Sequence, residues 1–230
     1  MPSSAATEPL VIDVVSDVVC PWCFIGKRRL ETAIASRPDL AVEVRFRPYF
    51  LNDWVPREGI SRTEYLTTKF GSVDRYNANA QRIVGVAAAE GLTYTPDKIK
   101  RQPNTIDCHR LIHWAEAAGG TAGAARMKQR LMDLYFTEGG DLTDREVLVK
   151  AAADCGLDAE QVRTQLASDL DVAEVTEAAE AAKNSGVDGV PFFIFGGILA
   201  VSGAQSPEHL VSAMERAIAE REKAVAQATA

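Results

Sequence analysis

Two cysteines three positions apart, in the stretch Cys20–Cys23 (Cys-Pro-Trp-Cys), stand where an apolar run gives way to a helical pattern. The run before them, residues 10–15, has the length and the β-branched content of a buried strand. After them, apolar residues such as Leu30 and Ile34 recur with the period of a helix. Pro21 suits the first turn of that helix, because its missing N–H would have had no partner there. The sequence therefore predicts a strand, then a dithiol at a helix N-terminus, then the helix.

The predicted helix N-terminus favours a negative charge on Cys20. Unpaired backbone N–H groups and the positive end of the helix dipole both stabilise an anion at that position. We therefore expect Cys20 to face solvent as a thiolate, with a pKa below the free value of ~8.5. Cys23 lies one turn later and is expected to point inward, where it could resolve a mixed disulfide formed at Cys20.

A Cys-x-x-Cys pair has two other interpretations. It can be half of a zinc site, which normally needs four ligands, or it can be an inert structural bridge. No second Cys-x-x-Cys pair or comparable set of histidines is evident in the sequence. The strand before the pair and the helix that starts at it favour redox chemistry, while both alternatives stay open.

Composition limits the expected partners and compartment. With 230 residues, the chain can bury a full core as one domain, or as one domain that carries an insertion. Its net charge of −7 and the lack of a basic stripe argue against nucleic acid as a partner. No export signal or membrane-spanning run is recognisable, so we expect a cytoplasmic protein with no membrane contact. In a reducing compartment, such a cysteine pair is more often catalytic than structural.

The rest of the chain changes from a sheet pattern to a helical one and back. Residues 42–48 alternate as a half-buried strand, which completes a β-α-β unit with parallel pairing. Residues 61–185 are predicted to form successive helices. A hairpin follows at 190–201, with a two-residue turn of the primed type at Gly196-Gly197. A last helix is predicted to start at Ser206-Pro207.

Local signals predict where the helices begin and end. Ser61 with Glu64 and Thr143 with Glu146 fit the capping box that marks a helix start. Glycines are expected to end helices at Gly91, Gly119, Gly156 and Gly186. Because a sheet pattern resumes after the helices, we expect an insertion domain of residues 61–185 within a discontinuous domain of residues 8–60 and 186–225.

Six short motifs occur in order along the chain. They are Ser16-Asp17, Cys20-Pro21-Trp22-Cys23, Ile25-Gly26-Lys27, Glu138-Gly139, Gly189-Val190-Pro191-Phe192 and Val201-Ser202-Gly203-Ala204-Gln205. Together with the order of elements, they resemble the DsbA family of thioredoxin-fold oxidoreductases, and most closely its cytosolic FrnE-like branch. The resemblance spans nearly the whole chain. It implies an α/β thioredoxin fold (β-α-β … β-β-α) with a large all-helical insertion, and the activity of a protein disulfide oxidoreductase.

The resemblance also implies roles for individual residues. Cys20 resembles the attacking thiolate and Cys23 resembles the resolving thiol. Pro191 resembles a cis-proline that faces the cysteines, so that the Val190 backbone would be presented to a substrate.

The residues between the two cysteines differ from the best-known DsbA pattern. Trp22 stands where that pattern has a histidine, so the thiolate would receive less stabilisation. We therefore expect a Cys20 pKa between the ~3.5 of DsbA and the ~7 of thioredoxin, and a less oxidising disulfide. Pro21 and Trp22 are also expected to contact substrate, with Trp22 as an apolar platform or simply packed.

Five other residues are weaker candidates. The resemblance implies that Asp13, in the first strand, could relay protons to the resolving thiol, or could simply be a polar residue at a strand edge. It also implies that Asn104 and His109, at the start of an insertion helix, could bind substrate. Cys108 could resolve or regulate but is more simply explained by burial. His109 and His113 are spaced so that they could share a metal, although two ligands are weak support.

Three functions fit these observations. The favoured one is an exchange enzyme whose redox-active Cys20–Cys23 disulfide needs no separate cofactor. Its partners would be thiol- or disulfide-containing proteins or small thiols, with glutathione as a candidate co-substrate. The second is a glutathione-dependent isomerase or transferase of the kappa or hydroxychromene-carboxylate isomerase type, although these usually have serine in place of Cys20. The third is a non-catalytic chaperone or partner-binding module. A monomer and a homodimer are both compatible with the sequence.

Overall fold

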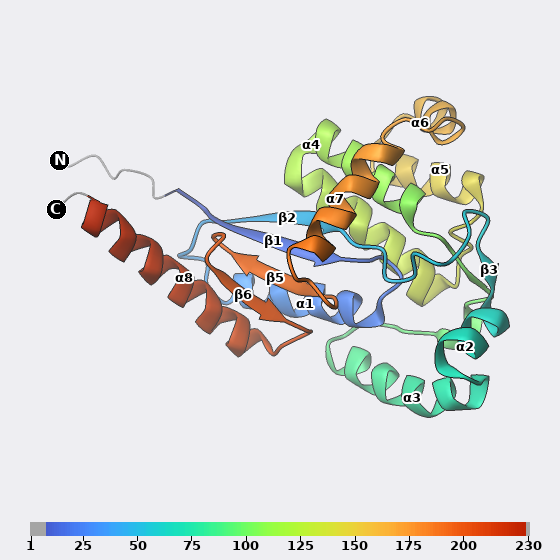
Figure 1. Cartoon of the computed structure of the whole chain (residues 1–230), viewed down its shortest axis with the longest axis horizontal. Helices are drawn as coiled ribbons and strands as arrows, with labels where there is room; N and C mark the ends of the chain where they lie inside the picture. Colours follow the sequence, from blue (N-terminus) through green and yellow to red (C-terminus); the bar gives the residue numbers. More distant parts are fainter. Residues whose placement is uncertain (1–7, 229–230) are drawn as a thin grey trace.

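The computed structural model describes residues 8–228, with a four-stranded mixed sheet at the centre (Figure 1). The strands are β1 (Leu10–Ser16), β2 (Val42–Pro48), β5 (Phe192–Phe195) and β6 (Leu199–Ser202). They lie in the order β2-β1-β5-β6, with β2 parallel to β1 and the other two pairs antiparallel. The predicted parallel β-α-β unit and the predicted hairpin are therefore confirmed.

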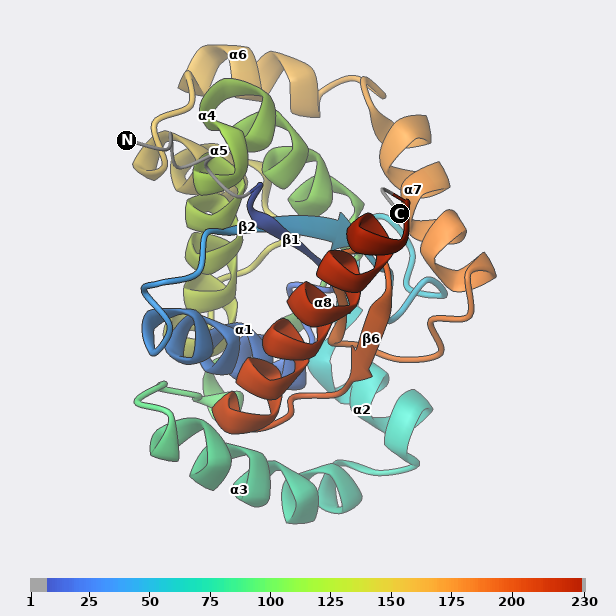
Figure 2. The ribbon, with the colours of Figure 1, turned by 90° about the vertical axis from the view of Figure 1, so that its left-hand side faces the viewer.

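Helices cover both faces of this sheet. α1 (Pro21–Ala35) and α8 (Pro207–Ala228) pack together on one face, while α4 and α7 pack against β2 on the other (Figures 1 and 2). The helices of the insertion are α2 (Arg62–Phe70), α3 (Val73–Ala89), α4 (Ile106–Asp133), α5 (Arg145–Asp154), α6 (Ala159–Leu166) and α7 (Val172–Asn184). α3 lies beside α1, so the insertion reaches around to the end of the sheet where the cysteines lie.

The sequence predicted an all-helical insertion, but the structure shows that the insertion is mostly helical and also contains strands. Two short strands, β3 (Ile60–Ser61) and β4 (Arg101–Gln102), pair antiparallel and join the start of α2 to the segment before α4. A 3₁₀ turn spans Pro96–Lys98, and α4 continues into a π-helical segment at Leu134–Glu138. None of the helices within residues 8–228 combines the length and the apolar character needed to cross a membrane.

The alternation of β1 decides which of its side chains enter the core. Leu10, Ile12 and Val14 are at most 2% exposed, whereas Val11 and Asp13 on the opposite face are only half-buried. Successive residues of a strand point to opposite faces, so a single strand can supply both an apolar core face and a partly polar face. This placement matters below, because it sends Asp13 away from the cysteines.

Of the two predicted capping boxes, the one at the start of α2 is confirmed and the one at the start of α5 is not. Ser61 caps α2 as predicted, because its side chain accepts a hydrogen bond from the backbone N–H of Glu64. The predicted cap at Thr143 is wrong. Asp144 caps α5 instead, by accepting from two backbone N–H groups, while the Thr143 hydroxyl donates to Asp141.

The glycines behave less uniformly than predicted. Gly91, Gly156 and Gly186 adopt positive φ just after their helices, as a C-terminal glycine does. At Gly119 a helical segment also stops, as predicted: Gly119 and Gly120 have non-helical backbone angles, and a second helical segment of α4 continues beyond this kink. In the hairpin, Gly196 and Gly197 both have positive φ, as a primed turn requires, but pairing resumes only at Leu199, so the loop has one residue more than predicted.

Candidate active site

Cys20 occupies the predicted position at the start of α1. It is the N-cap residue, Pro21 is the first helical residue, and the backbone N–H groups of Cys23 and Phe24 donate to the Cys20 carbonyl. The expectation that Cys20 faces solvent is wrong, because the residue is only 3% exposed. Its Sγ lies 3.6 Å from the Val190 carbonyl oxygen, which closes over it. The sulfur is reached through a cavity rather than directly from the surface.

Cys23 lies 3.5 Å from Cys20 and is not bonded to it. The Cys23 thiol donates a hydrogen bond to the Cys20 sulfur and lowers the pKa of Cys20, and backbone N–H groups of Cys23 and Trp22 add to this against the cost of burial. For Cys23 the direction is opposite. Burial, together with the hydrogen bond and charge of Cys20, raises its pKa well above the ordinary value. The site therefore holds one sulfur prepared to be a thiolate and one prepared to stay protonated.

The Val190–Pro191 peptide bond is cis, and Pro191 lies directly against α1. A Cβ added to Gly26 would come within 2.8 Å of the Pro191 ring and 3.3 Å of Phe193, so only glycine allows this approach. The Gly26 of the sequence motif thus has a packing role, which is to bring the Val190 carbonyl up to the Cys20 sulfur.

Three buried polar residues lie close to the dithiol on the side of β1 and α4, and we call them the polar floor: Asp17, His109 and Lys128. Asp17 is fully buried, and its carboxylate accepts from the backbone N–H groups of Val18 (2.7 Å) and Leu51 (2.9 Å). It also pairs with His109 Nε2 at 3.3 Å. Although burial opposes ionisation, these contacts hold the pKa of Asp17 below its ordinary value.

The other two members of the polar floor have their basicity reduced by burial. Burial lowers the pKa of His109, against the opposing pull of Asp17. Lys128 is 1% exposed and donates to the Ser16 carbonyl at 3.1 Å. Burial lowers its pKa to about 8, while the Cys23 and Asp17 charges partly oppose this. In return, the Lys128 ammonium lowers the pKa of Cys23.

The structure corrects the predicted role of Asp13. Its side chain lies on the half-exposed face of β1 and pairs with Arg47 on β2 at 2.7 Å. The buried carboxylate near the cysteines is Asp17, four residues later. Asp17 had stood out in the sequence only as part of the Ser-Asp motif. Lys128 is not identified from the sequence. The one available signal is that this lysine shares the buried face of α4 with the apolar Met127 and Leu131.

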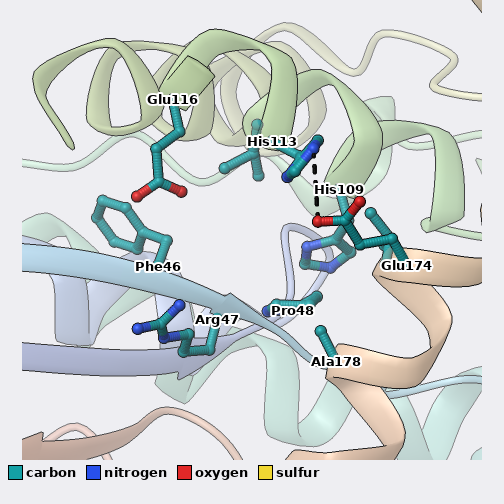
Figure 3. Close-up of a pocket in the computed structure, with 10 residues that line it drawn as sticks. Phe46, Arg47, Pro48, His109, His113, Glu116, Glu174 and Ala178 are labelled. Atoms are coloured by element: carbon teal, nitrogen blue, oxygen red, sulfur yellow. Dashed lines mark ion pairs between the residues drawn. The ribbon is translucent and has the colours of Figure 1, made fainter. Parts of the chain in front are cut away.

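Asn104 and His109 lie near the site, but neither lines the cavity beside Cys20. Asn104 lies one residue before Thr105, the N-cap of α4: its Oδ1 accepts from the Ile106 N–H (3.0 Å) and its Nδ2 donates to the Val55 carbonyl (2.8 Å). His109 lines a different pocket, between α4, α7 and the end of β2 (Figure 3). Both side chains hold structure around the site and do not face a substrate at Cys20.

The two histidines of α4 do not come together at one metal. His109 contacts Asp17, while His113 faces Glu174 of α7 at 3.8 Å (Figure 3). In the described part of the chain, the one close group of side chains able to ligate a metal is His113, Asp171 and Glu174, and it includes no cysteine. Cys108 is fully buried, and burial raises its pKa well above the ordinary value, as expected for a thiol that simply packs.

A cavity of about 270 Å³ opens beside Cys20. Of the residues that the sequence suggests as substrate contacts, Pro21, Trp22 and Val190 line it, whereas Pro191 is not part of the lining. Most of the remaining wall comes from the insertion, where α2, α3 and the π-helical segment after α4 contribute aromatic rings. α2 also contributes two cations, Arg62 and Lys69, which we call the cationic roof. No pattern in the sequence had pointed to either cation.

A dithiol at the start of a helix, against a cis-proline in a four-stranded sheet interrupted by helices, defines the α/β thioredoxin fold with a helical insertion. The match of residues 11–215 to the family described as "DSBA-like thioredoxin domain" agrees with this. The chain therefore belongs to the DSBA-like family of thioredoxin-fold proteins.

Three solved structures support this assignment to different degrees. The "probable DsbA oxidoreductase SCO1869" from Streptomyces coelicolor is 33% identical, with a TM-score of 0.84 and coverage of 92% of this chain and 91% of that one. A 2-hydroxychromene-2-carboxylate isomerase is 16% identical, with a TM-score of 0.68 and coverage of 93% and 98%. The cytosolic disulfide reductase DsbM from Pseudomonas aeruginosa, solved with GSH, is 17% identical, with a TM-score of 0.61 and coverage of 94% and 99%. The last two share the fold alone.

Proposed function

We propose that this protein is a thiol–disulfide oxidoreductase in which Cys20 and Cys23 form the redox pair. The observation that carries the proposal is the contrast between the two sulfurs: the pKa of Cys20 is lowered and that of Cys23 is raised, although they lie only 3.5 Å apart. An attacking thiolate and a protected resolving thiol need just this difference. The similarity to a DsbA oxidoreductase at 33% identity supports the same activity.

The exchange proceeds in two displacements. The Cys20 thiolate attacks one sulfur of a substrate disulfide, forms a mixed disulfide, and expels the other sulfur as a thiolate. Cys23 then loses its proton, attacks Cys20, and expels the second substrate sulfur. Two electrons pass from the protein dithiol to the substrate, and a Cys20–Cys23 disulfide remains. The same steps in reverse oxidise a dithiol substrate.

Insulin reduction in the presence of dithiothreitol tests this activity. We expect Cys20→Ser to abolish turnover, because the attacking atom is lost. Cys23→Ser should also stop turnover, and when it is incubated with insulin in the absence of dithiothreitol it should accumulate a mixed disulfide at Cys20, visible as an added mass that dithiothreitol then removes. Cys155→Ser, at a half-buried thiol outside the site, serves as the matched control and should keep full activity.

The same experiment separates the other two candidate functions. An isomerase of the hydroxychromene-carboxylate type would tolerate the loss of Cys23, and a binding module would tolerate the loss of both cysteines. Unchanged turnover in Cys23→Ser would therefore overturn the proposal. Partners are proposed to be thiol- or disulfide-containing molecules in a cytoplasmic, reducing compartment, where the pair would be regenerated as a dithiol.

A further inference from the structure

Arg62 is a cation of the cavity that has no carboxylate partner. Its Nη1 donates to Gln102 Oε1 (3.0 Å) and its Nη2 to the Tyr76 hydroxyl (2.9 Å). The guanidinium also lies over the Tyr65 and Tyr76 rings, at 5.1 and 5.0 Å. All of these partners are neutral, so the charge itself is not compensated. Within residues 8–228, no Asp or Glu lies at ion-pair distance from Arg62.

Lys69 is in the same situation on the neighbouring wall. Its Nζ donates to Asn52 Oδ1 (2.6 Å) and lies 5.6 Å from the centre of the Tyr65 ring. Burial lowers the pKa of Lys69, and the charge on Cys20 opposes that shift. No carboxylate pairs with Lys69 in the part of the chain that the structure describes. The Cys20 sulfur is therefore close enough to interact electrostatically with this ammonium.

Unused hydrogen-bond donors are concentrated at the same place. Within residues 8–228, two buried side-chain polar atoms have no hydrogen-bond partner: Arg62 Nε and Asn52 Nδ2. Both are donors. One belongs to Arg62 itself, and the other belongs to Asn52, whose side-chain oxygen accepts from Lys69. Buried donors are nearly always paired in native structures. Arg62 lines the cavity, and Asn52 lies behind the lining.

Another buried cation shows how the chain treats such a charge when no ligand is involved. Arg110 is fully buried, and it pairs with Asp107 at 2.7 Å while its remaining N–H groups donate to three backbone carbonyls. Burying a charge is costly unless it is paired and hydrogen-bonded. Arg110 has such partners within the fold, whereas the two cations of the roof have no carboxylate partner beside the reactive sulfur.

We propose that the cavity binds the carboxylate of a low-molecular-weight disulfide, with Arg62 and Lys69 as its counter-ions. The proposal rests on the proposed function and specifies its substrate class. A volume of about 270 Å³ suits a small molecule, and the aromatic walls suit the aliphatic part between carboxylate and sulfur. A guanidinium is the side chain best suited to pair with a carboxylate, and Arg62 lines the cavity without an acidic partner.

The chemistry balances without a further reactant. The Cys20 thiolate displaces one carboxylate-bearing thiolate from the bound disulfide, and Cys23 displaces the other. The protein becomes the Cys20–Cys23 disulfide, and the substrate leaves as two thiols after protonation. The cationic roof contributes by binding the carboxylate so that the S–S bond lies at Cys20.

Two disulfides of matched length test the inference: 3,3′-dithiodipropionate, which carries two carboxylates, and 2-hydroxyethyl disulfide, which is neutral. The pre-reduced full-length protein is mixed with each, and the rate of Cys20–Cys23 oxidation is measured. We expect the dianion to react faster than the neutral probe. Arg62→Met should lower that preference about tenfold, since a charge-assisted contact is lost, and Arg62→Lys should restore part of it. Arg82→Met is the matched control, because this exposed cation lies over Trp22 but outside the cavity lining.

The outcomes distinguish the inference from the proposed function. Equal rates for both probes, or a preference that survives Arg62→Met and Lys69→Met, would overturn the carboxylate site and leave exchange activity intact. If neither probe reacts, the proposed function fails instead. Calorimetric binding of dithiodipropionate to the Cys20→Ser, Cys23→Ser variant, lost on Arg62→Met, would then still support the anion site. Absence of such binding would overturn it.

Discussion

The polar floor and the cationic roof lie near the same sulfur, yet they pair their polar atoms differently. In the floor, Asp17 has three hydrogen-bond partners, and each of them lies within the fold. In the roof, Arg62 has neutral partners only and keeps an unused N–H. The difference indicates two tasks. The floor pairs its buried polar groups within the fold and moderates the pKa of Cys23 through Lys128, and the roof, as proposed above, offers its charge to a ligand.

The largest expected effect tests whether the floor is structural as well as electrostatic. Asp17→Asn should destabilise the protein by about 3 kcal/mol at pH 7. The new amide NH₂ group would face a backbone N–H group, and because both can only donate, a buried hydrogen bond would be lost. The folded-state pKa of Asp17 is lowered, so its contribution is present at neutral pH and is lost as the pH falls through that pKa. Urea unfolding of the wild type and the variant at pH 7 measures the loss of stability, and the same experiment in acid measures how far the difference between them shrinks.

Asp13→Asn is the matched control for that experiment. This carboxylate pairs with Arg47 at the half-exposed face of β1, where such pairs contribute little. We expect a change within about 0.5 kcal/mol. Equal effects at the two positions would remove the distinction between the buried and the surface carboxylate.

The second effect has the opposite sign. Lys128→Met should stabilise the protein by about 2 kcal/mol at pH 7, because a buried charge whose pKa is lowered to about 8 is replaced by an apolar chain. The unfolded protein binds more protons than the folded one between the lowered pKa and the ordinary value of 10.5. Wild-type stability therefore rises over that interval, and the gap to the variant should narrow.

The same variant should be a poorer enzyme. Without the Lys128 ammonium, the pKa of Cys23 rises further, so release of a mixed disulfide from Cys20 should slow about tenfold at pH 7. Stopped-flow rates across pH measure this step. A destabilised variant with an unchanged pH profile would contradict the assignment of Lys128 to the floor.

A smaller effect concerns Asn104, which the sequence placed in the substrate groove. Asn104→Ala should cost about 1 kcal/mol, because its hydrogen bonds to the Ile106 N–H and the Val55 carbonyl are lost, and should leave the rate of disulfide exchange unchanged. Thermal unfolding and the dithiodipropionate assay measure the two quantities. A variant with full stability but slow exchange would restore the substrate-binding role.

Among the residues of the floor and the roof, the smallest expected effect on stability is in the roof. Arg62→Met should change the free energy of unfolding by less than about 1 kcal/mol, because the lost contacts are offset by the removal of an uncompensated charge. Its partners also remain paired: Gln102 Oε1 still accepts from Tyr135 at 2.9 Å, and the Tyr76 hydroxyl still pairs with Tyr94 at 2.5 Å. Denaturant unfolding at pH 7 checks this, and a loss of several kcal/mol would show that the roof is structural.

Much of the fold follows from local patterns in the sequence. The alternation in residues 42–48, the β-branched run before Cys20 and the cap at Ser61 each act over a few residues, and each predicted its element correctly. The errors have local causes as well. Asp144 caps α5 in place of Thr143, because its carboxylate accepts from two backbone N–H groups at the start of the helix.

By itself, the sequence determined the positions of the two sulfurs, since a strand, an N-cap and a proline fix where a helix begins. Only the tertiary structure decided which charges surround them. Asp13 and Asp17 differ by four positions, yet strand alternation and the turn after β1 send one to the surface and the other beneath the cysteines. Arg62 and Lys128 reach the site from distant segments. Burial and the partners that burial provides set a charge's effect, and these are properties of the folded chain.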